Sequence, residues 1–226
     1  MNKTEVESFF ESITKEEKSF QSKYWSKLKP INDSETFQRY LFAFTSVHTT
    51  WERNVIGYNA IKDWWNWINR WDILGDRLKE SRIGLHNNRL KFISKFTTNF
   101  WSNPSYYIRR EGEVWSEFRN RIVNNITGLG MAKASFAVEM IYPDKAEVVC
   151  LDTHLFQAYG LNQTKHHRQY NVLENHWIDN SYKQNIPPYI ARCIYWDRKQ
   201  GKQDSRYWSH ALEEGDLAIE MQSILN

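Results

Sequence analysis

The chain has 226 residues, of which 41% are hydrophobic and 25% charged, and its formal net charge is +3 at pH 7. These values are typical of a globular protein that can bury one large core or two small ones, and they exclude a disordered chain. A net charge this small does not by itself indicate a nucleic-acid-binding protein, so any contact with DNA must come from local clusters of basic residues.

Apolar residues recur at helical spacing along almost the whole chain, and strand patterns are nearly absent. An amphipathic N-terminal stretch with Val6, Phe10 and Trp25 among its apolar residues ends at Pro30. Further helices are expected near residues 35–47, 51–71, 87–101, 112–125, 131–142, 153–159, 166–180, 187–199 and 205–224. No repeat of fixed period and no low-complexity segment interrupts this pattern, so the sequence predicts a compact all-α protein.

A tryptophan-rich stretch lies within the helix expected at residues 51–71. Trp64, Trp67 and Trp71 are spaced i, i+3, i+7, which predicts that they share one face of that helix. Aromatic faces can stack on unpaired bases, but the same spacing is typical of any buried helix stripe, and we expect core packing here. Trp51 is the better candidate for a base pocket.

The most informative segment joins a glycine turn to a helix. Gly128-Leu129-Gly130 directly precedes the helix expected from residue 131. Glycines allow the backbone to turn sharply, and the first N–H groups of a helix are free to bind an anion at the positive end of the helix dipole. The sequence therefore predicts a site where a phosphate can bind without a particular side chain.

About twenty residues further on, the segment VVCL leads to Asp152, at the start of the next expected helix. A carboxylate at such a position can cap the helix or face a cleft. Both interpretations are open from this residue alone, and the glycine turn upstream favours the functional one.

Three blocks of sequence, in the same order and at similar spacings, resemble the helix-hairpin-helix (HhH-GPD) DNA glycosylases, and endonuclease III-like members in particular. Residues 44–50 (FTSVHTT) are similar to a Leu-Ser-x-Gln-x-Thr segment of that family, and residues 83–89 (IGLHNNR) to its Ile-Gly-Leu-Tyr-Asn-x-Lys segment. Gly128-Leu129-Gly130 followed by Asp152-Thr153-His154 is similar to the family's hairpin and active-site aspartate. The resemblance extends over residues 37–160.

The resemblance implies a two-lobed helical HhH-GPD fold. Residues 34–150 would form a helical barrel domain that contains the helix-hairpin-helix, and residues 1–33 with 151–226 would form a second helical lobe, with DNA in the cleft between them. The implied activity is that of a DNA glycosylase, which flips a damaged or modified base out of duplex DNA and hydrolyses its N-glycosidic bond. Cleavage of that bond builds positive charge on the sugar, so a carboxylate beside the anomeric carbon, here Asp152, would stabilise the transition state.

The same resemblance implies which residues contact DNA. His48 would fill the space that the everted base leaves, and Leu85 would act as an apolar wedge, unless it is an ordinary core residue. Asn87 and Arg89 would bind phosphate at the start of the following helix. The implied DNA-binding set is Gly128, Leu129, Gly130, Ala132, Lys133, His48, Leu85, Asn87 and Arg89, and Trp51 with His154 are weaker candidates for the base pocket.

One departure from the family pattern bears on the chemistry. Members that also cut the strand have a lysine two places after the second glycine, whereas this chain has Ala132 there and Lys133 one place later. A shift of one residue rotates a helical side chain by about 100°, so we expect Lys133 to point away from the pocket, toward phosphate or solvent. We therefore expect a monofunctional enzyme that leaves an abasic site, unless a change of register turns Lys133 inward.

The residue counts bear on cofactors, and the resemblance implies the partner. Two cysteines, Cys150 and Cys193, cannot supply the four thiolates of an iron–sulfur cluster, and no histidine spacing indicates a metal site, although the hairpin is compatible with a structural monovalent cation. The expected partner is double-stranded DNA with a damaged or modified base, bound by a monomer. The N-terminus is not a signal peptide and no run is apolar enough to span a membrane, so a cytoplasmic, nucleoid-associated location is expected.

Two other functional classes remain open. A non-catalytic DNA-binding protein could keep the hairpin and the wedge, although the presence of Asp152 argues against it. A nucleobase-modifying enzyme could use the same flipped-out geometry for different chemistry, because the residues that would read the base carry no sequence signature.

Overall fold

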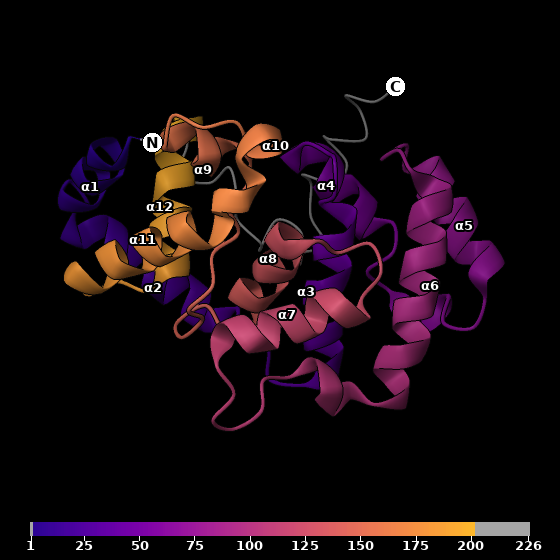
Figure 1. Ribbon diagram of the computed structural model, residues 1–226. Coiled ribbons are helices and arrows are strands. Elements are labelled where there is room, and N and C mark those ends of the chain that lie inside the picture. Colours follow the sequence, from indigo (N-terminus) through magenta and orange to yellow (C-terminus); the bar gives the residue numbers. More distant parts are fainter. Residues whose placement is uncertain (1, 202–226) are drawn as a thin grey trace.

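The structure is a computed structural model that describes residues 2–201, so the helix expected at residues 205–224 lies outside it. These residues form helices and connecting segments without a strand, which confirms the all-α prediction (Figure 1). Within residues 2–201 no helix is long and apolar enough to cross a membrane. The helices are α1 (Lys3–Glu11), α2 (Lys15–Lys27), α3 (Asp33–Thr45), α4 (Trp51–Asn59), α5 (Trp71–Glu80), α6 (His86–Ser102), α7 (Trp115–Asn125), α8 (Met131–Ile141), α9 (Thr153–Ala158), α10 (Gln163–His166), α11 (Tyr170–Lys183) and α12 (Pro188–Gln200), with the 3-10 helices η1 (Trp64–Asn66), η2 (Pro104–Tyr107) and η3 (His167–Gln169).

Helix α3 lies at the centre of the molecule and packs against α4, α6 and α8 (Figure 1). Nine of its thirteen residues are buried, because it is covered on several sides rather than on one face. Its aromatic residues fill the core; for example, Phe37 stacks on Phe96 of α6 with ring centroids 5.5 Å apart. Helix α8 also packs against α7, the helix that precedes the glycine turn.

The two ends of the described chain pack together. Helix α1 contacts α11, and α2 contacts α12, at the left of Figure 1. Thr14 separates α1 from α2 by a capping box, in which its side chain accepts from the N–H of Glu17 and the Glu17 carboxylate accepts from the N–H of Thr14. Segments far apart in the sequence therefore share one side of the molecule.

The tryptophan-rich stretch does not form the single helix expected at residues 51–71. Helix α4 ends at Asn59, Trp64 lies in η1 and Trp71 begins α5, so the three tryptophans do not share a helix face. Asn69, with a φ of 63°, turns the chain in between. The expectation of core packing rather than base stacking agrees with the burial: Trp67 is fully buried and donates to the carbonyl of Ile61 at 2.8 Å, and Trp64 stacks on Trp101 at 4.4 Å.

Two other expected helices have different bounds. The helix expected at 112–125 begins only at Trp115, because Gly112 has a φ of 73° that a helix cannot contain. The helix expected at 166–180 is divided into α10, η3 and α11, and α11 continues to Lys183. In both places the apolar pattern correctly predicted helical structure, but the predicted ends of the helix were wrong.

Arg198 of α12 joins the C-terminal helix to the N-terminal ones. Its guanidinium forms two hydrogen bonds with the Glu17 carboxylate, at 2.7 and 2.6 Å, and two more with Ser12. The hydrogen bond from Arg198 is the main reason why the pKa of Glu17 is lowered from its ordinary value of 4.5.

We predict that Arg198→Met lowers stability at neutral pH by about 1 kcal/mol, the upper value for partly exposed ion pairs. A carboxylate whose pKa is lowered in the folded state contributes stability above its ordinary pKa and loses it as the pH falls through the lowered pKa. The difference in unfolding free energy between wild type and Arg198→Met should therefore shrink below about pH 4.5. Urea unfolding between pH 7 and pH 3 measures it, with Lys199→Met as control; a difference that does not change with pH would contradict the prediction.

Candidate active site

The glycine turn between α7 and α8 is a tight hairpin. Its two positions differ in whether the fold requires glycine there. Gly128 has a φ of 98°, and a Cβ there would lie 2.4 Å from Cδ2 of Phe92, so the fold itself requires glycine. Gly130 has an ordinary φ of −76°, and a Cβ there would meet nothing within 4 Å. Leu129 is buried and anchors the turn, so of the expected DNA-binding residues it can offer only its backbone.

The N-terminus of α8 is open to an anion. Gly130 is the N-cap residue, and no side chain caps the helix. The first backbone hydrogen bond runs from the N–H of Ala134 to the carbonyl of Gly130, so the N–H groups of residues 131–133 have no helical acceptor. In Figure 1 the hairpin leads from α7 into the upper end of α8, the end that carries these groups.

Asp152 is the N-cap residue of α9 and is half-buried. One carboxylate oxygen accepts from the N–H groups of His154 and Leu155, at 3.0 and 3.1 Å. The other accepts from the indole N–H of Trp196 on α12 at 3.2 Å. The carboxylate is thus held in one orientation while part of it reaches the surface.

The segment before Asp152 is extended, and buried side chains bind its backbone. Glu174 accepts from the N–H of Val149 at 2.8 Å, and Glu139 accepts from the N–H of Cys150 at 3.1 Å. The Tyr170 hydroxyl donates to the carbonyl of Val149 at 2.6 Å. Because no neighbouring strand supplies hydrogen bonds here, these side chains satisfy the backbone groups that burial would otherwise leave unpaired.

Each of the two buried carboxylates is paired with a buried arginine. Arg192 of α12 binds Glu139 with contacts of 3.0 and 2.8 Å, and Arg119 of α7 binds Glu174 at 3.0 and 3.2 Å. Arg119 is therefore buried and does not form an exposed basic cluster with Arg121. Arg121 is itself half-buried and binds Glu113.

Lys133 is half-buried, and its side-chain nitrogen lies 5.5 Å from the ring centroid of Phe136. The expectation that Lys133 points away from the pocket stays a prediction. Glu139 of α8 accepts from the N–H of Cys150, two residues before Asp152, so the helix after the hairpin contacts the segment that carries the candidate carboxylate. Burial raises the pKa of Cys150 to about 12, so this thiol is not a nucleophile at neutral pH.

Aromatic rings line the region beside these groups. Trp51, at the start of α4, is half-buried and 5.4 Å from the ring of Phe42, which in turn is 6.0 Å from Phe136. His154 lies edge-on to Trp196 at 4.5 Å, and its Nδ1 makes no hydrogen bond within the described structure. The structure thus connects Trp51 to the Lys133 region through two phenylalanines, and His154 to Asp152 through Trp196.

Residues from the segments 44–50 and 83–89 line a cavity of about 370 Å³ next to the hairpin. Its lining includes His48, Leu85, Arg89 and Gly128. His48 and Leu85 are exposed, so Leu85 is not a core residue, whereas Asn87 is exposed on α6 outside this lining. Arg89 differs from expectation: only 4% of it is exposed, and its guanidinium binds backbone carbonyls instead of reaching outward to phosphate.

Several residues of the site were not found from the sequence. Trp196 and Arg192 lie on α12, about forty residues beyond Asp152, and only the tertiary fold brings them close. Glu139 carried a usable signal, because it is a charged residue inside the apolar run of α8, and a buried carboxylate there requires a partner. No group of three or more His, Cys, Asp or Glu residues that could hold a metal ion occurs within residues 2–201.

Three solved structures are similar to this chain. An 8-oxoguanine DNA glycosylase from Methanocaldococcus jannaschii aligns with a TM-score of 0.72 and 20% identity, over 87% of this chain and 94% of the other. The 8-oxoguanine DNA glycosylase of Thermotoga maritima aligns with a TM-score of 0.71 and 16% identity, over 89% and 99%. The M. jannaschii 8-oxoguanine glycosylase/lyase in complex with a 15mer DNA containing 8-oxoguanine aligns with a TM-score of 0.67 and 19% identity, over 88% and 97%.

Neither the protein-family models nor the curated protein sequences give a match to this chain. The structural likenesses extend over nearly the whole described chain, and at these identities they establish the fold. The chain therefore has the helical fold of the helix-hairpin-helix DNA glycosylases, and the fold that the resemblance implied is confirmed.

We predict that alanine at the two hairpin glycines affects different properties, DNA binding at Gly130 and stability at Gly128. Gly130→Ala should leave the melting temperature nearly unchanged, because its Cβ has space, but should weaken DNA binding, because a methyl group would stand where a phosphate approaches the backbone. Gly128→Ala should instead lower stability by several kcal/mol through the clash with Phe92 and the positive φ. Thermal melts and filter binding to a 20-base-pair duplex measure both; unchanged DNA affinity in Gly130→Ala would contradict a phosphate site there.

We predict that removing one partner of the Glu139–Arg192 pair lowers stability strongly, whereas replacing both partners lowers it little. Glu139→Gln leaves the Arg192 charge buried without its counter-charge, which should destabilise the protein by roughly 3–5 kcal/mol. Adding Arg192→Met should recover most of that loss, because no charge then remains uncompensated, and the amide oxygen of the introduced glutamine can still accept from the N–H of Cys150. Urea unfolding of both variants measures the difference; a double variant as unstable as the single one would refute this account.

Proposed function

We propose that this protein is a DNA glycosylase that everts a damaged or modified base from duplex DNA and hydrolyses its N-glycosidic bond. The observation that carries the proposal is the carboxylate of Asp152. It is half-buried, fixed by three hydrogen bonds, and follows a segment whose Cys150 N–H binds Glu139 of α8, the helix after the hairpin. The neighbouring structures are of 8-oxoguanine DNA glycosylases, so 8-oxoguanine is the first base to test.

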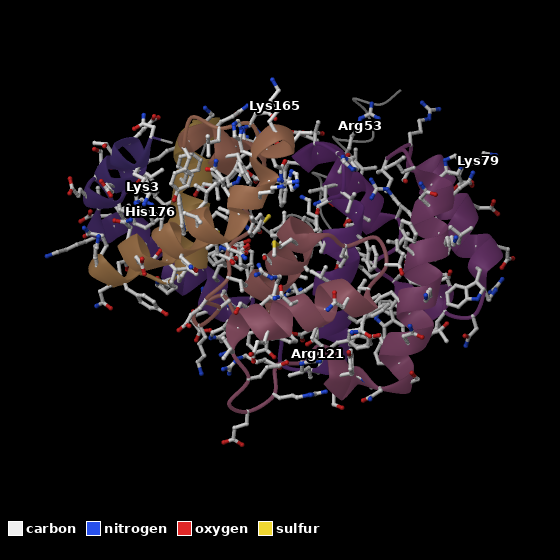
Figure 2. All side chains as sticks on the ribbon, viewed as in Figure 1. Lys3, Arg53, Lys79, Arg121, Lys165 and His176 are labelled. Atoms are coloured by element: carbon white, nitrogen blue, oxygen red, sulfur yellow. The ribbon has the colours of Figure 1, made fainter. Side chains whose placement is uncertain are left out.

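In this proposal the hairpin binds the DNA backbone. The uncapped N–H groups at the start of α8 bind a phosphate near the target nucleotide, and the open space around Gly130 lets that phosphate approach. Residues 34–150 act as one lobe and residues 1–33 with 151–226 as the other, with DNA in the cleft between them. Figure 2 shows Lys165 at the upper edge of the molecule, whereas Arg53 donates to the carbonyl of Arg82 at 3.1 Å.

Asp152 acts on the sugar in two ways. As the base departs, positive charge develops at the anomeric carbon, and a carboxylate about 4 Å away stabilises it by roughly 4 kcal/mol at an effective dielectric constant near 20, or about a thousandfold in rate. An ionised carboxylate has about four lone-pair positions. His154, Leu155 and Trp196 use three of them, which leaves one for the attacking water.

The reaction is hydrolysis without a covalent lysine intermediate. Ala132 stands where lyases of the family have their lysine, and the Lys133 ammonium group lies over the face of Phe136. A lysine packed over a ring face has its side chain engaged by that contact, which supports a role for Lys133 other than attack on the sugar.

We predict that Asp152→Asn lowers single-turnover base release by about a thousandfold, because the electrostatic stabilisation is lost. Lys133→Met should retain base release. The measurement is free-base release and alkali-labile sites in duplexes that carry 8-oxoguanine and a panel of other damaged or modified bases, together with DNA affinity for both variants.

Other outcomes would contradict this proposal in distinct ways. Trapping to DNA by borohydride that disappears in Lys133→Met would show a lyase. Binding that prefers damaged DNA without release of any base would favour a non-catalytic protein, and an altered base that stays attached to the sugar would favour a base-modifying enzyme. Base release that Asp152→Asn leaves unchanged would remove Asp152 from the mechanism.

A further inference from the structure

The two exposed tips beside the hairpin share an unusual backbone conformation. His48 follows α3 with a φ of 51°, and Leu85 precedes α6 with a φ of 50°. Residues other than glycine rarely occupy this left-handed region, because it is strained for them, and they stay there only where their surroundings fix them. Both tips line the same 370 Å³ cavity, Leu85 with 48% of its surface exposed.

One buried guanidinium binds the backbone of both tips. Nη2 of Arg89 donates to the carbonyl of Val47, directly before His48, at 2.6 Å. Nε of Arg89 donates to the carbonyl of Gly84, directly before Leu85, at 3.0 Å. Nη1 donates to the carbonyl of Phe44, in the last turn of α3.

The charge of Arg89 makes these bonds strong. Hydrogen bonds from an ionised donor are roughly twice as strong as neutral ones, and the planar guanidinium fixes their directions. Burial lowers the pKa of Arg89 to about 10, so the side chain still carries its proton at neutral pH. With 4% exposure it is not available to bind phosphate.

We propose that Arg89 is the positioning residue that holds His48 and Leu85 at a fixed separation, so that both side chains enter the base stack of duplex DNA together. This inference rests on the proposed function, because it assumes that DNA with an everted base is the ligand. Two tips that are fixed before binding lose little conformational freedom when they insert, whereas two mobile tips would have to be ordered at the expense of affinity. The strained backbone at both tips is then a consequence of holding the side chains outward.

The test uses a duplex with a tetrahydrofuran abasic-site analogue, which has a gap in the base stack and no base to release. Wild-type protein should bind this duplex more tightly than the undamaged one, and Arg89→Met should reduce that preference by about tenfold. Affinity for the undamaged duplex, which depends on phosphate contacts, should not change. In a Leu85→Gly background, Arg89→Met should add less than about twofold, since positioning a tip that is absent has no effect.

Two further variants separate positioning from general destabilisation. Arg121 also binds backbone carbonyls, those of Tyr106 and Ile108, but it lies in the lower part of the molecule in Figure 2 and does not line the cavity. Arg121→Met should therefore lower stability and leave the preference intact. Arg89→Lys keeps the charge but cannot reach all three carbonyls, so its preference should be intermediate. All variants are compared at a temperature at which circular dichroism shows them folded.

Three results would overturn the inference. An equal loss of affinity for both duplexes in Arg89→Met would show a phosphate contact or a general defect, and a loss of preference in Arg121→Met would show that stability alone controls it. A wild-type protein without preference for the gapped duplex would show that the tips do not insert. Because this duplex has no base to release, these results do not depend on catalysis by Asp152, and base release can succeed or fail independently.

Discussion

The arrangement of the site depends on how the extended segment before Asp152 is held. A chain segment that is buried without neighbouring strands must find other partners for its N–H and carbonyl groups. Here Glu139, Glu174 and Tyr170 supply them from α8 and α11. Carboxylates are strong acceptors for backbone N–H groups, but they bring two negative charges into the core, and these charges are stable there only with arginines beside them.

The two ion pairs also join helices that are distant in the sequence. Glu139 and Arg192 connect α8 to α12, and Arg119 and Glu174 connect α7 to α11. Buried ion pairs add little net stability, because the loss of hydration offsets most of their attraction. Charged hydrogen bonds must be well aligned, however, so these pairs fix α7 and α8, on the two sides of the hairpin, against α11 and α12, and α12 carries Trp196. The site is thus positioned by interactions that a purely apolar core would not supply.

Local sequence patterns predicted the parts of the site that depend on local structure. The glycine turn, α8 and the N-cap position of Asp152 are short-range features, and all three are present. The prediction of a single helix through the tryptophan-rich stretch was wrong. An i, i+3, i+7 spacing does not show whether one helix runs through all three residues, and here Asn69 turns the chain between Trp67 and Trp71. The phosphate contact expected of Arg89 was wrong because the carbonyls that bind its guanidinium, around His48 and Leu85, are brought together only by the packing of separate helices. For the same reason the sequence alone does not show the role of an arginine, because a buried arginine that binds carbonyls and an exposed one that binds phosphate are the same residue type.

Asp152 shows why a structural and a functional interpretation of one residue need not exclude each other. A cap on α9 uses one carboxylate oxygen, which accepts from the first N–H groups of the helix. The indole of Trp196 then fixes the second oxygen. A carboxylate that must stabilise a developing cation also requires a single orientation and access from the surface. The capping bonds therefore prepare the group for the proposed chemistry, and a variant that kept the cap but lost the charge would separate the two roles.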